Sequence, residues 1–442
     1  MIKRFIRRVL GLESPGLQRM PQARHGVTRN AISSSALKVC DVLAERGYAA
    51  YVVGGAVRDI LLGITPKDFD VATDARPEQI KPLFRRALLI GRRFRLVHVM
   101  LGPETIEVST FRAADSQPAE KDEHGRVLRD NVFGTVAEDA RRRDFTVNAL
   151  YYDCRSGELV DYHGGLTDLK KRTLRIIGDP ETRYREDPVR MLRAVRLGAK
   201  LGLSIDASTR APIKRLAPLL EHVPPPRLFE EMLKLLLSGH ANACLRQLRH
   251  EGLHKGLLPL LDVILDQPLG ERFVTLALAQ TDERVLADRP VSPAFLFAAL
   301  LWHEVLAAWK AREKRGERRV PALEAAMDDV LDAQSGKLAI TRRLTATMRE
   351  VWAMQPRFEE RSGQRPHRLL ELPRFRMAYD FMALRTASGE VPAELESWWR
   401  AFQSAGPETR EEMLLPDTGP RKKRRRRRRK GHAAATPTAI PE

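Results

Sequence analysis

Two aspartates separated by one residue give the strongest chemical signal in the sequence. Asp68 and Asp70 lie in the segment 67–73, KDFDVAT, which has the pattern of a β-strand. Residues i and i+2 of a strand point to the same side, so both carboxylates are expected on one face, with Phe69 and Val71 on the other. Two such charges are costly unless a cation lies between them, and Mg²⁺ prefers oxygen ligands. The pair therefore predicts a Mg²⁺ site, with Mn²⁺ as the alternative ion; a solvent-facing strand edge is the alternative interpretation.

A phosphoryl-transfer site with two metal ions needs a third carboxylate from an adjacent strand. The segment 105–112, TIEVSTFR, has the alternation of a strand and offers Glu107 on one face. Glu107 is therefore the candidate for the third metal ligand.

A pair of glycines precedes the aspartates. Residues 48–53 form a short β-prone run, Gly54 and Gly55 follow it, and residues 56–62 have helical spacing. Residues without a Cβ let backbone N–H groups approach a phosphate closely, and Arg58 is placed to add a charged contact. Such turns also occur as ordinary chain reversals, but the aspartates at short range favour phosphate binding.

Five ordered motifs resemble the nucleotidyltransferase family that contains the bacterial poly(A) polymerases and the tRNA CCA-adding enzymes. The motifs are Gly54-Gly55-Ala-Val-Arg58-Asp59, Lys67-Asp68-Phe-Asp70, Glu107-Val-Ser-Thr-Phe-Arg112, Arg142-Arg143-Asp144-Phe145 with its continuation to Leu150, and Tyr184-Arg185-Glu186-Asp187-Pro188-Val-Arg190-Met-Leu-Arg193. The segments 91–98 and 128–134, the long C-terminal half and the basic tail resemble the poly(A) polymerase branch. The CCA-adding branch is usually shorter and lacks such a tail.

The resemblance implies an α+β fold: a polymerase β-like nucleotidyltransferase palm with a mixed sheet, followed by all-α neck and body domains. It also implies template-independent addition of AMP from ATP to RNA 3′ ends, in mRNA polyadenylation and RNA decay. Asp68 and Asp70 would hold two Mg²⁺ ions, one for the 3′-OH and one for the triphosphate. The alternative enzyme is a CCA-adding nucleotidyltransferase, and the alternative outside the enzymes is an RNA-binding protein that keeps an inactive form of the fold.

The resemblance also assigns Asp144 to the catalytic site, whereas strand geometry favours Glu107 as the third metal ligand. The sequence does not decide between these two carboxylates. We expect Asp144 and its arginines to position nucleotide and primer, with a salt-bridge role for the cluster as the alternative. The residues expected to bind ATP are Gly54, Gly55, Arg58, Arg112, Arg143, Glu186, Asp187, Arg190 and Arg193.

The stretch 184–203 is expected to select the base. Asp187 has the position of a helix N-cap, and the helix that follows places Arg190 and Arg193 on a face beside the cleft. By resemblance, Glu186, Asp187 and Arg190 would hold the incoming base by hydrogen bonds, so that the protein itself selects the nucleotide. The alternative is a helix whose arginines face only water.

Positive charge is concentrated near the C-terminus. The chain of 442 residues has a formal net charge of +19. Ten of these charges lie in one uninterrupted run: Arg421, Lys422, Lys423, Arg424, Arg425, Arg426, Arg427, Arg428, Arg429 and Lys430. Such a run repels itself, so residues 416–442 are expected to be a disordered tail that binds RNA phosphates in a salt-sensitive way.

Composition excludes several other classes of protein. No apolar run approaches the ~20 residues that cross a bilayer, and three widely spaced cysteines without a CxxC pair argue against a disulfide framework. We therefore expect a cytoplasmic monomer, with RNA-decay or RNA-chaperone proteins as further partners. Residues 1–10 have the pattern of a short basic amphipathic helix that could make peripheral membrane contact, and a frayed leader is the alternative.

Residues 250–254, HEGLH, match the HExxH pattern of zinc metalloproteases. Gly252 weakens a helix at this point, and the amphipathic run 244–253 ends here. We therefore expect a structural role at a helix end.

The pattern along the chain divides it into five parts. They are a leader and linker (1–30), the head (31–160), a neck for base recognition and RNA binding (161–223), a helical body that binds RNA (224–415) and the tail (416–442). Helical periodicity is expected at 228–237, 294–310, 322–331, 344–352 and 375–384. Trp398 and Trp399 are expected to anchor a helix in the core, with base stacking as the alternative.

Overall fold

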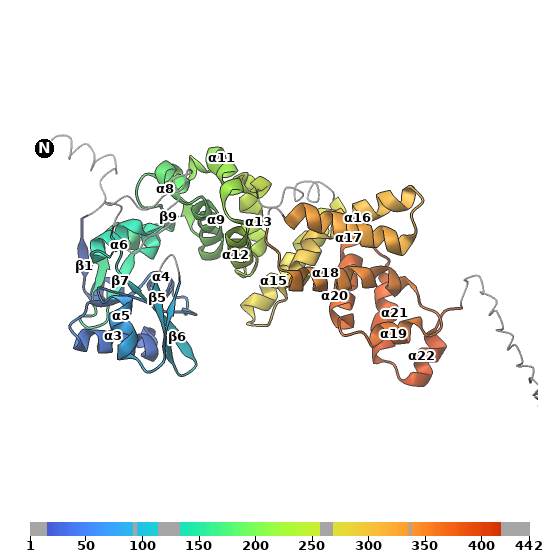
Figure 1. Ribbon diagram of the computed structural model, residues 1–442, viewed down its shortest axis with the longest axis horizontal. Helices are drawn as coiled ribbons and strands as arrows, with labels where there is room; N and C mark the ends of the chain where they lie inside the picture. Colours follow the sequence, from blue (N-terminus) through green and yellow to red (C-terminus); the bar gives the residue numbers. More distant parts are fainter. Residues whose placement is uncertain (1–15, 92–94, 114–132, 257–267, 336–337, 417–442) are drawn as a thin grey trace, which may run out of the picture.

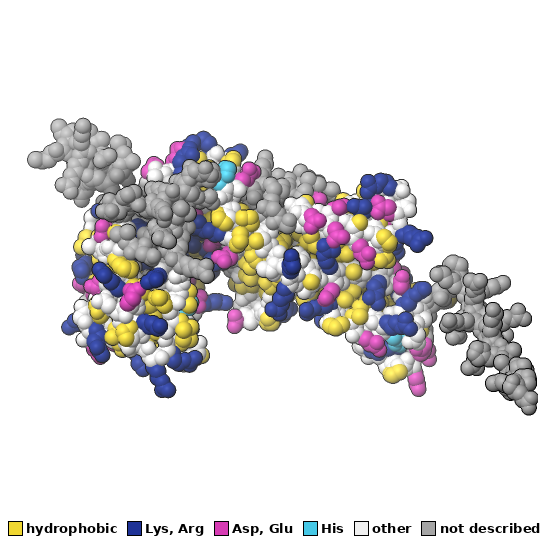
Figure 2. Space-filling model, viewed as in Figure 1, with side chains coloured by type: hydrophobic (Ala, Val, Ile, Leu, Met, Phe, Trp, Pro, Cys, Tyr) yellow, Lys and Arg dark blue, Asp and Glu magenta, His cyan; other side chains and the backbone are white. Residues whose placement is uncertain are grey.

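The computed structural model describes residues 16–91, 95–113, 133–256, 268–335 and 338–416. In Figure 1 the strands of the head lie at one end of an elongated molecule, helices continue from it, and a larger helical body forms the other end. Lys and Arg side chains are spread over the visible face of head and body (Figure 2). The predicted N-terminal helix 1–10, the basic run 421–430 and most of the segment 128–134 lie outside the described residues.

The described part of the head contains an eight-stranded mixed sheet, as expected. The strand order is β1-β8-β7-β2-β3-β6-β5-β4, in which β3 and β6 are parallel and the other neighbours are antiparallel. The strands are β1 (Gln18–Met20), β2 (Ala50–Val53), β3 (Asp70–Thr73), β4 (Ala87–Ile90), β5 (Leu96–Leu101), β6 (Glu104–Thr110), β7 (Leu150–Asp153) and β8 (Leu159–Asp161).

The two faces of this sheet are covered differently. One face buries Val71, Val97 and Val108 in the main core, to which α3 (Ser34–Glu45) also contributes. On the other face, α6 (Val136–Arg142) contributes to a smaller core over β2, β7 and β8. Beyond that core, towards β6, β5 and β4, polar and apolar side chains of this second face remain accessible to solvent.

Two expectations about the head need correction. The region 11–30 is not entirely a linker, because Gln18–Met20 pair with β8 and Met20 is buried; α2 (Gln22–His25) and η1 (Arg29–Ala31) follow. A three-residue edge strand whose partner lies far along the chain has no local signature. The strand predicted over 67–73 begins only at Asp70, although Phe69 and Val71 are buried as predicted.

Asp161, at the end of β8, determines how the next helix begins. Its buried carboxylate accepts hydrogen bonds from the backbone N–H groups of His163, Gly164, Gly165 and Leu166 at 2.8–3.1 Å. Helix α7 (Gly165–Lys170) therefore begins in close contact with the 3-10 turn η3 (Thr146–Asn148). A Cβ at Gly165 would lie 2.1 Å from the carbonyl oxygen of Thr146, a distance that no packed atom tolerates.

Gly165→Ala is expected to lower the free energy of unfolding by about 2–3 kcal/mol, because the new methyl group forces α7 and η3 apart. The measurement is urea denaturation followed by circular dichroism. The matched control is Gly406→Ala, because a Cβ at Gly406 meets nothing within 4 Å. Equal stability of the two variants would contradict the prediction.

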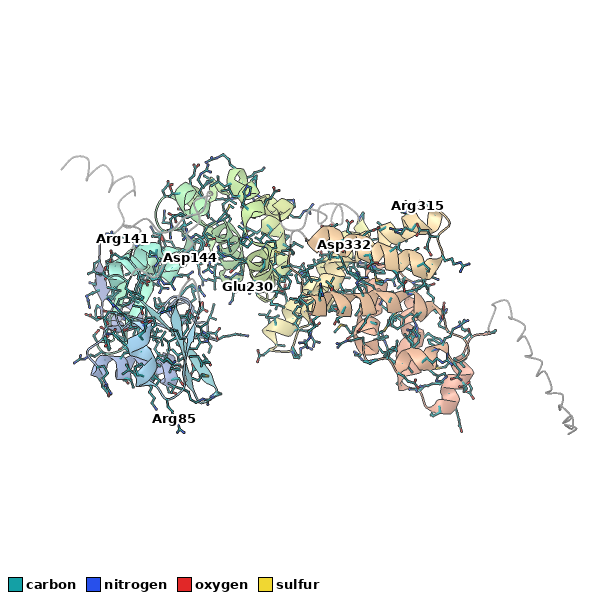
Figure 3. The ribbon with its side chains drawn as sticks, viewed as in Figure 1. Arg85, Arg141, Asp144, Glu230, Arg315 and Asp332 are labelled. Carbon is teal, nitrogen blue, oxygen red and sulfur yellow. The ribbon has the colours of Figure 1, made fainter. Side chains whose placement is uncertain are left out.

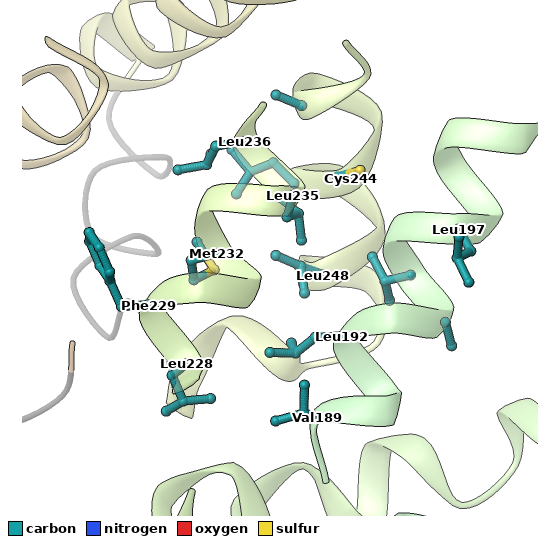
Figure 4. Close-up of a cluster of buried hydrophobic side chains, with 14 of the residues drawn as sticks. Val189, Leu192, Leu197, Leu228, Phe229, Met232, Leu235, Leu236, Cys244 and Leu248 are labelled. Carbon is teal, nitrogen blue, oxygen red and sulfur yellow. The ribbon is translucent and has the colours of Figure 1, made fainter. Parts of the chain in front are cut away.

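Helices packed through their apolar faces connect the head to the body. They are α8 (Pro180–Glu186), α9 (Val189–Leu201), α10 (Ala207–Arg210), α11 (Ile213–Leu216), η4 (Ala217–His222), α12 (Pro225–Leu236) and α13 (Ala241–His250). Figure 4 shows the core in which Leu192 of α9, Met232 of α12 and Leu248 of α13 lie together. All three are buried, and the helical run predicted at 228–237 is confirmed.

The body is helical throughout its described part. Its helices are α15 (Pro268–Leu286), α16 (Pro293–Lys314), α17 (Arg319–Ser335), α18 (Arg342–Met354), η6 (Gln355–Glu359), α19 (Arg365–Leu370), α20 (Phe375–Ser388), α21 (Ala393–Ser404) and α22 (Pro407–Met413). The core role predicted for the tryptophans is confirmed for Trp399, which is fully buried and donates to the carbonyl of Phe358 at 2.8 Å. Trp398 is half-buried, packs against the same core and donates to the carbonyl of Met413. The four other predicted helical runs lie within α16, α17, α18 and α20.

Among the described helices, α16 alone is long and apolar enough to cross a membrane by composition, with a mean hydropathy of 1.3 over its best window. The expectation that no apolar run approaches this length is therefore not met by composition alone. Two thirds of that window is buried inside the protein (67%), and Phe297, Trp302 and Val305 are fully buried. This is the burial expected of a helix at the centre of a folded body.

Candidate active site

β3 and β6 bring acidic side chains together on the open face of the sheet. In their parallel pairing Asp70 lies directly opposite Glu107, and Asp68 precedes the strand by two residues. Reduced solvation, followed by the negative charges of Glu107 and Asp68, raises the pKa of Asp70 to about 6, although Arg143 opposes the shift. Both effects disfavour the ionised form of Asp70. A cation at this position would stabilise that form, so the position is favourable for a cation.

This donor set fits a hard divalent cation. The ligands are carboxylate oxygens, Asp68 and Asp70 are exposed, and nearly half of the Glu107 side chain (46%) is accessible, so an ion can reach all three. Among the described residues, no three His, Cys, Asp or Glu side chains are already arranged as a ligand set. The carboxylates must therefore adjust when an ion binds, which their exposure permits.

Divalent-cation binding is expected to weaken below about pH 6. A carboxylate must be deprotonated to bind a metal, so protons compete with the ion below the raised pKa of Asp70 and do not compete well above it. Mn²⁺ titration followed by electron paramagnetic resonance at pH 5, 6, 7 and 8 measures the change. Asp70→Asn should flatten this pH dependence. An unaltered wild-type affinity between pH 5 and 8 would contradict the prediction.

Gly54 forms the turn between β2 and helix α4 (Gly55–Leu61). Its backbone has φ +77° and ψ −126°, which L-residues with a side chain rarely adopt. A Cβ at this position would also lie 3.3 Å from Nη1 of Arg143. The turn therefore requires glycine. The N–H of Gly54 itself donates to the carbonyl of Leu150 at 3.3 Å, so the donors placed for a phosphate are the N–H groups of the first turn of α4.

Arg58 is less available than the sequence suggests. Its side chain is buried and donates to Asp59 Oδ1 and, at 2.6 Å, to Asn148 Oδ1. The amide of Asn148 in turn donates to Asp144 Oδ1 at 3.0 Å. Arg58 thus connects the glycine turn to Asp144, and a direct contact between Arg58 and a phosphate stays a prediction.

Asp144 lies where the head meets the helices that follow it (Figure 3). Burial alone would raise its pKa, but the guanidinium of Arg193 and hydrogen bonds from Asn148 and the Phe145 N–H hold the pKa of Asp144 far below its usual range. Arg193 Nε donates to Asp144 Oδ2 at 2.8 Å. Asp144 is therefore engaged in an ion pair while Glu107 is accessible, which favours Glu107 as the third metal ligand and a positioning role for Asp144.

Two arginines flank the carboxylates. Arg143 donates to the hydroxyl of Tyr151 at 2.8 Å and to Asp139 at 3.2 Å, and its guanidinium lies 5.1 Å from the centre of the Tyr151 ring. Arg112 lies close enough to Glu107 and Arg143 for their charges to affect its pKa, which burial lowers. Arg112 and Arg143, two of the five arginines predicted to bind ATP, thus lie next to the acidic cluster.

A cavity of about 250 Å³ opens beside Asp144. It is lined by Arg142, Arg143, Asp144, Asp187, Val189, Arg190, Arg193, Arg227 and Glu231. Oδ2 of Asp187 accepts a hydrogen bond from Arg227 at 2.6 Å, whereas Oδ1 is buried and has no hydrogen-bond partner in the described structure. Glu231, which also lines the cavity, has a buried Oε2 that likewise lacks a hydrogen-bond partner among the described residues. Such oxygens beside a polar cavity are candidate acceptors for a ligand that donates a hydrogen bond.

Glu186 and Arg190 are bonded to each other beside this cavity. Arg190 Nη1 donates to Glu186 Oε2 at 3.0 Å, and Arg183 donates to the same oxygen at 2.7 Å. The prediction that Asp187 caps helix α9 is wrong, because α9 begins at Val189 and the Asp187 carboxylate contacts Arg227 instead of a backbone N–H. A tertiary ion pair has replaced the local cap.

Sequence reasoning missed the contribution of α12 to the cavity. Arg227 and Glu231 both line it, and Glu231 is buried within 4 Å of Arg193 and Arg196. The one signal available in the sequence is that Glu231 interrupts the apolar run 228–237. A charged residue on the apolar side of a helix is rarely buried without a partner.

The expected structural role of the HExxH segment is confirmed. Helix α13 ends at His250, Gly252 has φ +73°, and the 3-10 turn η5 (Leu253–Gly256) follows, so the two histidines do not share a helix face. Glu251 is buried and accepts from Arg210 Nε at 2.8 Å.

Comparisons with known proteins identify the family of this chain. The family described as "Poly A polymerase head domain" matches residues 50–175, "Probable RNA and SrmB- binding site of polymerase A" matches 202–265, and "Polymerase A arginine-rich C-terminus" matches 315–431. Poly(A) polymerase I of Escherichia coli is 47% identical over 93% of both chains, and that of Haemophilus influenzae is 44% identical over 89% of both.

The CCA-adding enzymes are more distant. That of Bacillus licheniformis is 37% identical over 54% of this chain and 58% of its own. The crystal structure of the Bacillus stearothermophilus CCA-adding enzyme in complex with CTP has a TM-score of 0.56 at 26% identity, covering 83% of this chain and 80% of that one. Because the similarity to the poly(A) polymerases extends over nearly the whole chain, the protein is a nucleotidyltransferase that belongs to the poly(A) polymerase family.

Proposed function

We propose that this chain transfers AMP from ATP to the 3′ ends of RNA without a template and releases pyrophosphate. One observation carries the proposal. Carboxylates suited to divalent cations lie on an open sheet face beside the Gly54 turn and near a polar cavity that contains an unsatisfied carboxylate oxygen of Asp187. The names of the relatives that match most of the chain support the same activity.

Different residues of the site would hold the metal ions and the triphosphate during phosphoryl transfer. Asp68, Asp70 and Glu107 would hold two Mg²⁺ ions, or Mn²⁺ in their place, which when bound supply activation of the 3′-OH and neutralisation of the leaving charge. The backbone at Gly54 and the guanidinium of Arg143 are placed to hold the triphosphate, since they lie against each other next to the acidic cluster. In the reaction the RNA 3′-oxygen bonds to the α-phosphorus as the bond to pyrophosphate breaks.

The cavity beside Asp144 is proposed to hold the adenine base. The amino group of adenine can donate to the open Oδ1 of Asp187, while Arg227 keeps the carboxylate in place through Oδ2. Arg190 is held by Glu186 and adds a donor at the rim. An amino group satisfies this buried acceptor, whereas a carbonyl oxygen in the same place would be repelled.

RNA binding is proposed for the helical half and the basic tail. The helices after the head match a family described as a probable RNA-binding site, and the run 421–430 supplies ten positive charges for phosphates. We further propose a cytoplasmic role in mRNA polyadenylation and RNA decay.

The test is a 3′-extension assay that offers each of the four nucleoside triphosphates separately. The substrates are a generic single-stranded RNA and a tRNA that lacks its CCA end. Long A tails on both RNAs are expected, with little use of CTP. Strong CTP use confined to the tRNA would indicate CCA addition instead, and RNA binding without any extension would indicate a protein that has lost catalysis.

A further inference from the structure

The row of acidic side chains continues across the sheet into a histidine and an exposed apolar edge. Asp70 of β3 is paired with Glu107 of β6, Glu107 with His98 of β5, and His98 with Leu88 of β4. Residues paired directly across neighbouring strands point to the same face of a sheet. Consistent with this, Nε2 of His98 lies 3.8 Å from Oε2 of Glu107.

This end of the row is open and apolar. Leu88 is 53% exposed and Ile90, two residues further on the same face, is 39% exposed. β4 is the edge strand of the sheet, and the small core beneath α6 lies over β2, β7 and β8 at the other end. Exposed leucine and isoleucine side by side next to an active site are typical of a ligand-binding surface.

The position of the glycine turn indicates which ligand this surface receives. The triphosphate is assigned to the end of β2, at Gly54, and β2 lies on the far side of β3 from β6, β5 and β4. In phosphoryl transfer the attacking and leaving oxygens are roughly in line, on opposite sides of the phosphorus. If pyrophosphate leaves towards Gly54, the attacking 3′-OH must therefore approach from the side of Glu107 and His98.

We propose that Leu88, Ile90 and His98 form a platform that binds the 3′-terminal nucleotide of the RNA and presents its 3′-OH to the carboxylates. This inference rests on the proposed function, which requires an RNA end at the site. A nucleobase has two flat apolar faces that pack on aliphatic side chains and on an imidazole ring. Arg86, exposed and two residues before Leu88, supplies positive charge for the adjoining phosphate.

The first test maps where the RNA end lies. The full-length protein is irradiated with a short RNA whose 3′-terminal nucleotide is 8-azido-3′-deoxyadenosine, and the cross-linked peptide is identified by mass spectrometry. Cross-links to the described strands β4 and β5 around the platform, within 86–91 or 95–98, are expected. Cross-links confined to α9 or α12, around the base cavity, would overturn the proposal.

The second test compares the two faces of β4. The double variant Leu88→Ser/Ile90→Ser is expected to raise the KM for a short RNA by about tenfold, through lost base packing, and to leave the KM for ATP unchanged. The matched control is Leu89→Ser, because Leu89 is 39% exposed and lies on the same strand but on the opposite face. Equal KM values for RNA in the double variant and in the control would overturn the platform.

The two proposals fail in different ways. If the proposed function is wrong, the unmodified protein extends no RNA with ATP. If only the platform is wrong, the unmodified protein extends RNA normally, while the cross-link falls elsewhere and the two faces of β4 respond alike to substitution.

Discussion

Replacing Asp68 and Asp70 together with alanine is expected to lower adenylate incorporation by about 10³-fold or more. The carboxylates lie on an open face beside Glu107, and reduced solvation, followed by the charges of Glu107 and Asp68, raises the pKa of Asp70. Without them, the site would not hold the divalent cations that would neutralise charge on the triphosphate and the attacking oxygen. The measurement is single-turnover transfer of radiolabelled AMP to an RNA primer, with RNA affinity measured separately by filter binding.

The affinity for RNA and the free energy of unfolding are both expected to be unchanged or nearly unchanged by this substitution. The basic run 421–430 and the helical half carry the proposed RNA contacts, and removing two repelling charges from an accessible surface relieves repulsion instead of creating a cavity. Glu107→Gln should also reduce incorporation severely, whereas the control Glu104→Gln, at the start of the same strand, should not. Adenylate incorporation that persists in the double variant would disprove the metal-dependent mechanism.

The sequence predicted the parts of the site that depend on local patterns. The strand segment around Asp70 buries Phe69 and Val71, and the pairing of Asp70 with Glu107 follows from two alternating strands that share a sheet. The glycine turn was equally predictable, because Gly54 has a backbone conformation that other residues rarely adopt. Alternation and φ preference are local properties, and they are therefore visible without the fold.

The parts that depend on contacts distant in sequence were not predictable. Asp187 has the local position of an N-cap but forms an ion pair with Arg227, which lies 40 residues further along the chain. β1 is formed by three residues whose hydrogen-bond partners lie in β8. The hydrogen bond from Arg58 to Asn148, 90 residues further along the chain, was not predicted either, while a contact of Arg58 with a phosphate stays a prediction. In each case a tertiary partner determines the outcome.

Those tertiary contacts form one connected network through the site. Arg58 at the glycine turn bonds Asn148, Asn148 bonds Asp144, and Asp144 pairs with Arg193 of α9. Arg193 also approaches Glu231 of α12. The glycine turn and the cavity beside Asp144 are therefore connected by buried and partly buried charged hydrogen bonds, which are strong and geometrically specific. This explains why Asp144 can be essential without being a metal ligand.

The same reasoning makes Asp187 the residue on which nucleotide choice should depend. Asp187→Asn is expected to reduce kcat/KM for ATP by about 10²-fold, because hydrogen bonds to a charged group contribute about 1.5–3 kcal/mol each. One such bond joins Asp187 to Arg227, and Oδ1, which has no hydrogen-bond partner in the described part of the chain, is the proposed acceptor for the adenine amino group. Discrimination against GTP should narrow as well, since an asparagine amide can donate to the guanine carbonyl that a carboxylate repels.

The measurement is kcat/KM for ATP and for GTP on one RNA primer, and the ratio of the two values is the decisive quantity. Asp179→Asn is the matched control: Asp179 caps the first turn of α8 through Thr182, at the opposite end of the helix that Asp187 follows. Replacing this capping carboxylate should slightly lower the free energy of unfolding and leave the ratio of the kcat/KM values for ATP and GTP unchanged. A ratio that stays at its original value in Asp187→Asn would show that the Asp187 carboxylate does not select the base, whereas Glu231 Oε2, the other buried acceptor without a hydrogen-bond partner among the described lining residues, would still be present.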